Sequence, residues 1–510
     1  MRQDEIDLPT LSSLRIDDIR NLSSLYGEPE WMSRMREQNF TRYQSLPDEI
    51  SPLYSKYSDV NRLYLDRVKL SVASNPPESN DFLADRLNEL DKEIGLVRVG
   101  STIIKLNRNE GGSEEDSIII EDLATAIKSH EDKIKDALLK HAEGYDEDKF
   151  MALESSAFKS GIFIYVPKDL IVENPIRLVC ALSQDATSSI SRNLFISGEG
   201  SRCTIVQELY SPSVADSPSV ADSPSVADSP SVADSPSVAD SPSVADSPSV
   251  QQGVFELTEC HVGNGSNLEM ITLEALDSNN VSFLNKRAWV ERDAKMSWYH
   301  GLFGGQTTRC KVDSIMRGTG ASAEDVEIIF GNTTQSFDIT SNLNHIGRHS
   351  RGRVLVKSVM RDKSKSLFKG MIKIGKDAKA SESYLAGHAI LLDKDAKSDA
   401  IPGLEIQTNE VKATHSASVA QLDEVQIYYL MCRGLDRDSA KREIVSGFLE
   451  PLTRRMGPTI RAWINYLLEN KWSGKPLILK ADDALEQMLE VERSRYRESQ
   501  DLFEKHYKYR

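Results

Sequence analysis

The chain has 510 residues, of which 27% are charged and 39% are hydrophobic, a balance typical of soluble globular proteins. Its formal net charge is −16, and six of these charges belong to one repeated segment, so the rest of the chain carries −10. Nucleic acid and anionic membranes need a concentrated basic face, so neither is expected as a partner. The first residues, MRQDEIDLPTLSS, are charged, and no stretch approaches the ~20 apolar residues of a membrane span, which favours a cytoplasmic protein.

Residues 1–150 are predicted to be mostly helical. PEWMSRMREQNFTRYQSL, DFLADRLNELDKEIG and EDLATAIKSHEDKIKDALLKHA each place apolar residues at helical spacing. In the third segment the apolar residues on one side are Leu123, Ile127, Ile134, Leu138 and Leu139. We expect these helices to form a cap or appendage.

Residues 151–420 read as short β-type runs between small polar turns, such as GIFIYVPK, IRLVCAL, CTIVQEL and RVLVKSVM. So many strands with no intervening helix favour a stacked solenoid, because sandwiches and barrels close with fewer strands. The turn Asp-Ala-Lys recurs at Asp293, Asp377 and Asp395, and the last two are eighteen residues apart, which predicts a coil of about that length. The predicted fold class is mainly β with helical flanks: a parallel β-helix between an N-terminal helical region and a C-terminal helical unit.

One hexapeptide, SPSVAD, occurs six times in succession from Ser211 to Asp246, and a further SPSV ends at Val250. Stacked hexapeptide coils are one interpretation, but each copy has only two small apolar residues and a proline that cannot donate to a strand ladder. Packed repeats usually diverge, whereas these copies are identical. We therefore interpret residues 211–250 as a disordered loop between a strand that ends near Leu209 and one that starts at Val254.

Helical spacing returns after residue 420. DEVQIYYLMCRG and DRDSAKREIVSGFLEPLTRRM are predicted to be two antiparallel helices with Gly434 as the C-cap between them. They belong to a helical unit over residues 421–475. The charged segment 476–510 is predicted to be a helical, solvated tail.

Few segments carry motifs of catalysis or metal binding. We find no GxxxxGK[ST], GxGxxG, GxSxG or HExxH, so no nucleotide site is expected. The five cysteines are widely separated and are interpreted as buried, reduced thiols. His345 and His349 lie four apart, which suits metal ligation on a helix but not on a strand, where ~13 Å would separate them, so surface polar roles are expected. His415 lies where strands give way to helices, with Glu405 and Glu410 nearby, and such a histidine is more often a hydrogen-bonded residue than a ligand.

Several segments resemble the SufB/SufD family of iron–sulfur cluster assembly proteins. GEPEWM near the N-terminus, DKFMALESSAFKSGIFIYVPK before the strands, and NHIG, GMIKI and THSA farther along occur in the family's order. YYLMCRGLDRDSAKREIVSGFLEPL then resembles the family's C-terminal core. The family fold is a right-handed parallel β-helix with helical flanks, which agrees with the fold predicted above.

The resemblance implies a non-catalytic assembly subunit that binds a SufC-type ATPase and pairs with a SufB-type paralogue or with itself. In the family the C-terminal helical unit docks the ATPase, which implies a contact surface at about Asp423 to Leu452. The residues expected at this contact are Asp423, Tyr428, Tyr429, Arg433, Gly434 and Phe448. The end of the β-helix would pair with the paralogue.

Within the family this sequence departs from the SufB-like members, here called the B type, and these departures indicate the SufD-like members, the D type. Ile406 stands where the B type has its cluster-building cysteine, and Ser416 follows His415 where the B type has an acidic residue. Ala413 stands where D-type proteins can carry a cysteine. A thiolate is the usual iron–sulfur ligand, so Ile406 cannot serve as one. The resemblance implies that His415 contributes to a transient iron or iron–sulfur site at the subunit interface, with no stably bound cofactor.

Two other cysteines and two other functions remain to be considered. Cys310, on a strand, is a further candidate metal ligand, and Cys432, among apolar residues, is interpreted as a core residue. A SufB-like homodimer that itself holds a cluster is one alternative. The other is a β-helix carbohydrate-active enzyme, which needs carboxylates clustered on one face. The carboxylates considered for it are Asp325, Glu327 and Asp338, which are loosely placed.

Overall fold

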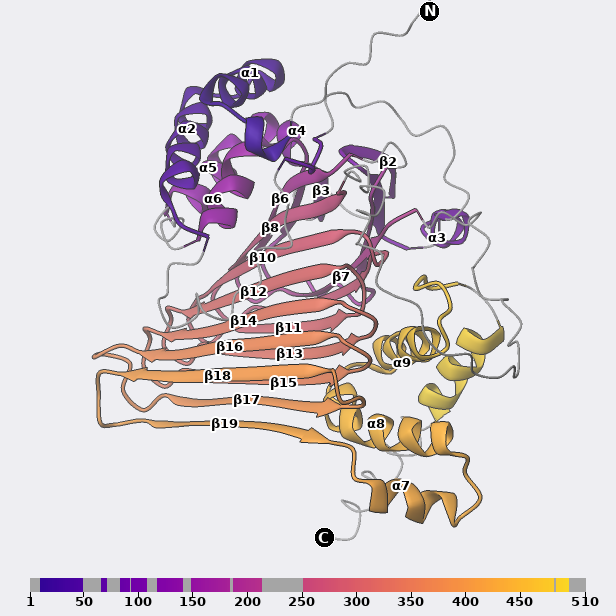
Figure 1. Cartoon of the computed structure of the whole chain (residues 1–510). Coiled ribbons are helices and arrows are strands. Elements are labelled where there is room, and N and C mark those ends of the chain that lie inside the picture. Colours follow the sequence, from indigo (N-terminus) through magenta and orange to yellow (C-terminus); the bar gives the residue numbers. More distant parts are fainter. Residues whose placement is uncertain are drawn as a thin grey trace, which may run out of the picture.

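The structure is a computed structural model that describes residues 10–48, 66–70, 83–91, 93–107, 117–140, 148–183, 187–212, 251–480 and 483–494. Figure 1 shows a stack of coils with helices beside its first and last coils. The predicted mainly β fold with helical flanks is confirmed, because a parallel β-solenoid lies between an N-terminal helical region and C-terminal helices.

The solenoid has two walls, and from β4 onward successive strands alternate between them. In the described ranges, the ten-stranded sheet contains β1 (Gly95–Val99), β2 (Thr102–Asn107), β5 (Ile176–Ala181), β7 (Arg202–Tyr210), β9 (Asn267–Ala275), β11 (Lys295–Leu302), β13 (Ser322–Gly331), β15 (Arg351–Met360), β17 (Glu382–Leu391) and β19 (Lys412–Gln421). The nine-stranded sheet contains β3 (Ile119–Asp122), β4 (Ile162–Val166), β6 (Ser189–Ser197), β8 (Gly253–Val262), β10 (Val281–Val290), β12 (Thr307–Met316), β14 (Ser336–His345), β16 (Lys365–Ile374) and β18 (Lys397–Ile406). Only β1–β2 and β3–β4 are antiparallel among these pairs.

The coil is longer than the sequence suggested. From β8 onward, paired strands are in register at spacings from 26 residues, between Val281 and Thr307, to 32 residues, between Lys365 and Lys397. The predicted coil of about eighteen residues is therefore wrong. That spacing joined two Asp-Ala-Lys turns at opposite edges of one coil, the first after β16 and the second after β17.

Inward-pointing side chains fill the space between the two sheets, which we call the lumen. Because neighbouring strands are in register, each inward position repeats in the next coil and forms a column, for example Met270, Trp298, Asp325 and Val354. Most inward residues are apolar and fully buried, and burial of this surface stabilises the fold by about 25 cal/mol per Å². The lumen is therefore the main hydrophobic core.

Helices cover the first coils. They are η1 (Leu11–Ser13), α1 (Ile16–Tyr26), α2 (Glu30–Ser45), α3 (Ala84–Glu89), α4 (Leu123–Ser129), α5 (Glu131–Lys140) and α6 (Lys149–Ala157). The predicted helix from residue 121 is broken at His130 into α4 and α5, and of its five predicted apolar residues only Leu139 is exposed. The ring of Phe150 on α6 packs at a tilt against the ring of Phe283 on β10, with ring centres 4.5 Å apart, so α6 packs directly on the solenoid. Strands β1 to β3 in this region were not predicted from the sequence.

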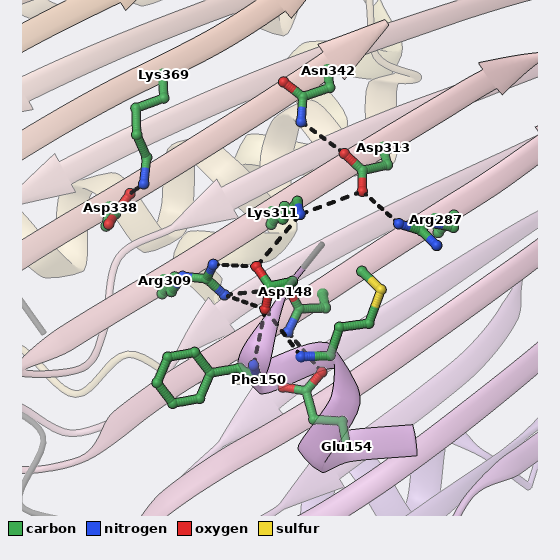
Figure 2. A network of polar contacts seen from close by, with 12 residues as sticks. Asp148, Phe150, Glu154, Arg287, Arg309, Lys311, Asp313, Asp338, Asn342 and Lys369 are labelled. Atoms are coloured by element: carbon green, nitrogen blue, oxygen red, sulfur yellow. Dashed lines mark hydrogen bonds and ion pairs between the residues drawn. The ribbon is translucent and has the colours of Figure 1, made fainter. Parts of the chain in front are cut away.

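Asp148 anchors α6 to the outer face of the nine-stranded sheet (Figure 2). Its carboxylate accepts the backbone N–H groups of Phe150 and Met151, each at 3.0 Å, and so caps the helix. Arg309 and Lys311 of β12 form ion pairs with the same carboxylate. Burial alone would raise the pKa of Asp148, but the two cations outweigh it and hold the pKa well below its ordinary value.

The C-terminal helices are α7 (Glu424–Met431), α8 (Arg437–Thr453) and α9 (Pro458–Trp472), followed by helical residues 483–494. Helices α8 and α9 pack on the outer face of the ten-stranded sheet, mainly over β13. Gly434 lies between α7 and α8 with φ +96°, a conformation that favours glycine, so the predicted turn is in place. Leu485 and Glu492 are buried, and Glu492 binds Arg461 at 2.8 Å. Residues 483–494 are helical, as predicted, and most of them are exposed, so this helix meets solvent except along the side that carries Leu485 and Glu492. The rest of the predicted tail, 495–510, lies outside the described residues.

The SPSVAD run lies between the two strands predicted to flank it. Strand β7 ends at Tyr210 and β8 begins at Gly253, within one residue of the expected positions. The Ser211 hydroxyl oxygen accepts the backbone N–H of Asp277 at 2.6 Å. The predicted disorder of the run concerns residues 213–250, which lie outside the described residues.

Candidate partner-binding surfaces at the last coil

The last coil has no strand stacked on it in the described part of the chain. Strand β18 pairs only with β16, and β19 pairs only with β17. Each therefore presents a row of backbone N–H and C=O groups along one edge, and such edges readily pair with another chain. We call β18 and β19 together the open coil.

Apolar residues that would be core in an inner coil are exposed in the open coil. Ile406 is in register with Ile374, and Leu404 is in register with Ile372. Both partners are buried, whereas Ile406 and Leu404 are 41% and 38% exposed. The open coil therefore shows solvent a cross-section of the hydrophobic core.

His415 lies at the mouth of the lumen. It is in register with the buried core residue Leu385, so its side chain occupies an inward position, yet it is exposed. Its imidazole makes no hydrogen bond to any described residue, which leaves a ring nitrogen available as a ligand. Strand β18, which carries Ile406, contacts β19 across the lumen.

The outer side of the open coil is bound to the coil before it. Ser416 lies 3.1 Å from the Tyr384 hydroxyl, and Ser418 lies 2.7 Å from Nδ1 of His388. Burial, and then the nearby charge of Lys357, lowers the pKa of His388. The outer hydroxyls of Ser416 and Ser418 are thus engaged within the chain, whereas the inward face of β19 is uncovered.

Helix α7, beside the open coil, buries almost none of its apolar surface. Only Ile427 is buried, whereas Val425, Tyr428 and Tyr429 are 72%, 68% and 56% exposed. Val425 and Met431 lie within the predicted contact range of about Asp423 to Leu452, although the sequence did not single them out, and both are exposed. An exposed cluster of aromatic and aliphatic residues on one short helix is typical of a protein–protein contact. We call it the α7 surface.

The other residues predicted for this contact divide between the α7 surface and the fold. Asp423 caps α7, and Arg433 stacks on Tyr429, 4.6 Å from its ring centre. Phe448 is half-buried, with Nζ of Lys357 4.5 Å from its ring centre. Lys357 is on β15 and also donates to the Phe448 carbonyl, so Phe448 joins α8 to the sheet.

The cysteines do not join His415 in a ligand set. Cys310 is fully buried on β12, and burial raises its pKa well above the ordinary value, which keeps it a thiol. Strand β12 is separated from β18 by β14 and β16. Cys432 is exposed after α7, so its interpretation as a core residue is wrong, because the apolar face of α7 points to solvent. Within the described ranges no three His, Cys, Asp or Glu side chains are grouped as metal ligands.

The two histidines four residues apart have different environments. His345 is fully buried, with its ring nitrogens 2.8 Å and 2.9 Å from the hydroxyls of Ser350 and Ser383. Burial lowers its pKa to about 4. His349 is exposed in the next turn with φ +57°. The predicted surface role is therefore wrong for His345, whose side chain enters the lumen.

The carboxylates considered for a carbohydrate-active enzyme do not share an exposed face. Asp325 and Glu327 are buried inside the lumen. Asp338 is on the outer face of the nine-stranded sheet, 2.7 Å from Nζ of Lys369 (Figure 2). No sugar can reach the first two from solvent, so these three carboxylates do not form the shared site that this alternative needs.

A cavity of about 790 Å³ lies between α8, α9 and residues 484–492. Its floor includes Phe330 and Trp472. Six of its charged residues form ion pairs: Arg442 with Glu469, Arg454 with Glu450, and Arg461 with Glu492. These pairs leave none of the six as a free charged group in the cavity.

These features define a class of protein: a two-walled parallel β-solenoid whose first coils are covered by helices and whose last coil is open beside an uncovered helix. No helix in the described ranges is long and apolar enough to cross a membrane.

Comparisons with known proteins give the family. Residues 24–178 match the model described as SufBD protein N-terminal region, and residues 241–448 match SUF system FeS cluster assembly, SufBD core domain. The chain belongs to the SufBD family of iron–sulfur cluster assembly proteins.

Similar proteins cover nearly its whole length. The iron–sulfur cluster assembly protein SufD of Bacillus subtilis is 25% identical over 457 residues, 88% of this chain and 95% of the relative. SufBD family proteins of Staphylococcus saprophyticus and Staphylococcus aureus (strain USA300) are each 23% identical, over 470 and 469 residues, 89% of this chain and 92% of the relatives.

Proposed function

We propose that this chain is a SufD-type, non-catalytic subunit of the cytoplasmic iron–sulfur cluster assembly machinery. It pairs with a SufB-type paralogue through the open coil and binds a SufC-type ATPase through the α7 surface. The exposed core cross-section of the open coil is the observation that carries this proposal, because an isolated solenoid gains nothing from leaving Ile406 and Leu404 in water.

The D-type assignment is supported by the residues at the mouth of the lumen. Ile406 and Ala413 supply no thiolate there, and His415 is an exposed residue whose imidazole can act as a metal ligand. An imidazole can ligate iron that a partner's thiolates hold in part. In this proposal His415 contributes one ligand to a cluster or iron ion that is the cargo of the assembly and is bound only transiently.

The ATPase contact is tested by co-expression with a SufC-type ATPase and a SufB-type paralogue, followed by affinity purification. The double variant Tyr428→Ala and Tyr429→Ala should weaken capture of the ATPase by about tenfold or more, because large exposed aromatic residues dominate such contacts. The control is Leu25→Ala, which removes an exposed apolar side chain from α1. Equal loss in both variants, or none, would overturn the assignment of α7.

The pairing surface is tested by Ile406→Asp in the same co-expression. A charge in the buried centre of an interface should abolish capture of the paralogue while capture of the ATPase persists. Ile171→Asp is the control, since Ile171 is also exposed but lies far along the chain from the open coil. Retained pairing in Ile406→Asp would show that the partner binds elsewhere.

The role of His415 is tested on the purified complex. His415→Ala should leave both partners bound and lower the iron and sulfide that the complex retains after anaerobic reconstitution. The chain reconstituted alone should stay colourless. A visible chromophore in the isolated chain, diminished by His415→Ala, would instead favour the homodimeric scaffold.

A further inference from the structure

Two acidic residues lie side by side inside the lumen. Asp325 and Glu327 are on β13, and both point inward because Asp325 is in register with Trp298 and Glu327 is in register with His300. Both carboxyl groups are sealed from solvent, at 1% and 0% exposure. Buried carboxylates are costly unless cations or hydrogen-bond donors compensate them.

Ser341 contacts both carboxyl groups from the opposite sheet. Its hydroxyl lies on β14, within hydrogen-bonding distance of Asp325 and 2.8 Å from Oε1 of Glu327. A serine hydroxyl has one hydrogen to donate, and ionised carboxylates only accept. Both contacts are therefore hydrogen bonds only if one carboxyl group carries a proton and donates it to the Ser341 oxygen.

No cation within hydrogen-bonding distance takes the place of that proton. Oδ1 of Asp325 and Oε2 of Glu327 have no hydrogen-bond partner among the other described residues, and the two carboxyl groups are close enough to hydrogen-bond to each other when one of them is protonated. His300 is fully buried with both ring nitrogens also without a partner, and its Nε2 lies 3.8 Å from Oδ1 of Asp325. Burial, and then the charge of Lys286, lowers the pKa of His300 well below its ordinary value, so the imidazole is neutral.

The charged and titratable groups around the pair do not neutralise it. They come from five strands and are Glu274 of β9, Lys286 of β10, His300 of β11, Cys310 of β12 and Glu324 of β13. The ammonium group of Lys286 donates to Gln207 at 3.1 Å. Burial raises the pKa of Asp325 to about 7, and burial together with the neighbouring carboxyl raises the pKa of Glu327 well above its ordinary value.

We propose that Asp325, Glu327 and Ser341 form one proton-binding site that joins the two walls of the solenoid. In the protonated state one hydrogen runs from a carboxyl group to Ser341, and the Ser341 hydrogen runs to the other carboxylate. Release of that proton to water leaves two carboxylates and only one donor between them. One contact between β13 and β14 is then lost, and two negative charges face each other in the lumen.

Infrared spectroscopy of the full-length protein tests the protonation directly. At pH 7 the wild type should show carbonyl stretches of buried carboxylic acids, shifted in D₂O, and Glu327→Gln should remove or displace one component of this band, while components from Glu154 and Glu274, whose pKa values burial also raises, should remain. The matched control is Asp313→Asn, because Asp313 is also buried but is paired with Arg287 and Lys311, which lower its pKa against burial. The absence of an acid band in the wild type, or its loss in Asp313→Asn alone, would overturn the proposal.

The pH dependence of unfolding gives a second test. A carboxyl pKa raised by folding makes stability fall as pH rises from the unfolded value, about 4, through the folded value. The unfolding midpoint of the wild type should fall more between pH 5 and pH 8 than that of Glu327→Gln. Ser341→Ala keeps both buried carboxyl groups and removes a donor whose hydrogen bonds lower their pKa values, so its curve should fall at least as steeply as that of the wild type. Curves of equal slope in the wild type and Glu327→Gln would refute the proposed site.

Discussion

The two ends of the solenoid differ in how the apolar surface of their terminal coils is covered. At the first coils the antiparallel strands β2 and β3 extend the two sheets, and α6 covers the outer face of the nine-stranded sheet, where the Phe283 ring contacts the rings of Phe150 and Phe255. At the last coil nothing in the described residues covers Ile406 or Leu404. Each coil buries its apolar surface against the coil on either side, so the end of a stack is either capped by the chain itself or leaves apolar surface exposed.

The difference also shows in the charges. The covered end is held by buried ion pairs, such as Asp148 with Arg309 and Arg36 with Glu28. The ion pairs near the open coil, such as Lys379 with Glu410, are exposed. Buried pairs fix one geometry at a high cost if broken, whereas exposed pairs contribute little. Buried ion pairs within this chain thus fix the geometry of the covered end, whereas the ion pairs near the open coil contribute little to its geometry.

The largest expected effect comes from placing one charge at each end. Ile164→Asp on β4 puts a carboxylate into the buried core and should destabilise the protein by about 4 kcal/mol or more. Ile406→Asp makes the same change at an exposed position and should shift stability by less than about 1 kcal/mol. Denaturant unfolding of the isolated chain measures both. Equal destabilisation would mean that the open coil is closed within the chain.

The next effect separates two caps at the covered end. Asp148→Asn leaves Arg309 and Lys311 buried without their carboxylate and should cost about 3 kcal/mol or more. Asp122→Asn is the control, since Asp122 caps α4 through the N–H groups of Ala124 and Thr125 and should cost about 1 kcal/mol or less. Similar losses in the two variants would show that the ion pairs add nothing to the cap.

Acid should reduce the stability difference between the wild type and Asp148→Asn, but it should not reduce the difference between the wild type and Asp122→Asn in the same way. Folding lowers the pKa of Asp148, so its stabilising contribution is present above the unfolded pKa of about 4 and is lost as pH falls below that value. Burial raises the pKa of Asp122, so it contributes nothing of this kind. The gap in unfolding free energy between wild type and Asp148→Asn should therefore narrow on acidification from pH 6 to pH 3, and a constant gap would contradict the ion-pair account.

The smallest effect is expected between the two ends, at the repeated segment. Deleting Ser211–Asp246 leaves Ser247 and Pro248 directly after Tyr210, so the same Ser-Pro pair follows β7. Shortening the connection should stabilise the chain by ~1–2 kcal/mol at most through loop entropy. Thermal unfolding and partner capture measure the outcome. A deletion variant that does not fold would mean that the run packs against the solenoid.

Much of the fold could be predicted because its strands and helices have local periodicity. The strand around Val354 and the helix α2 could each be predicted from the spacing of their apolar residues alone. The coil length could not be predicted, because turns at opposite edges carry the same letters and only strand pairing distinguishes them. The predicted environments of Cys432 and His345 were also wrong, because the apolarity of neighbouring residues does not show which face of a helix or strand packs against the core.

The candidate site depended on resemblance more than on pattern. Nothing local to His415 marks it, because its neighbours Thr414 and Ser416 are those of an ordinary surface strand. Its inward position follows only from its register with Leu385. The sequence showed Asp325 and Glu327 as two nearby carboxylates. Their burial could not be predicted, because it depends on the strands of the coils on either side, β11 and β15.

The crossing from β7 to β8 has a consequence for how such a gene can change. Each SPSVAD copy is six residues and therefore a whole number of codons, so replication slippage that adds or removes a copy keeps the reading frame. Every such allele still begins with Ser-Pro after Tyr210 and still reaches Gly253 through the same letters. A change in the number of copies therefore alters only the length of the connection between β7 and β8 and leaves the sequence of both strands unchanged.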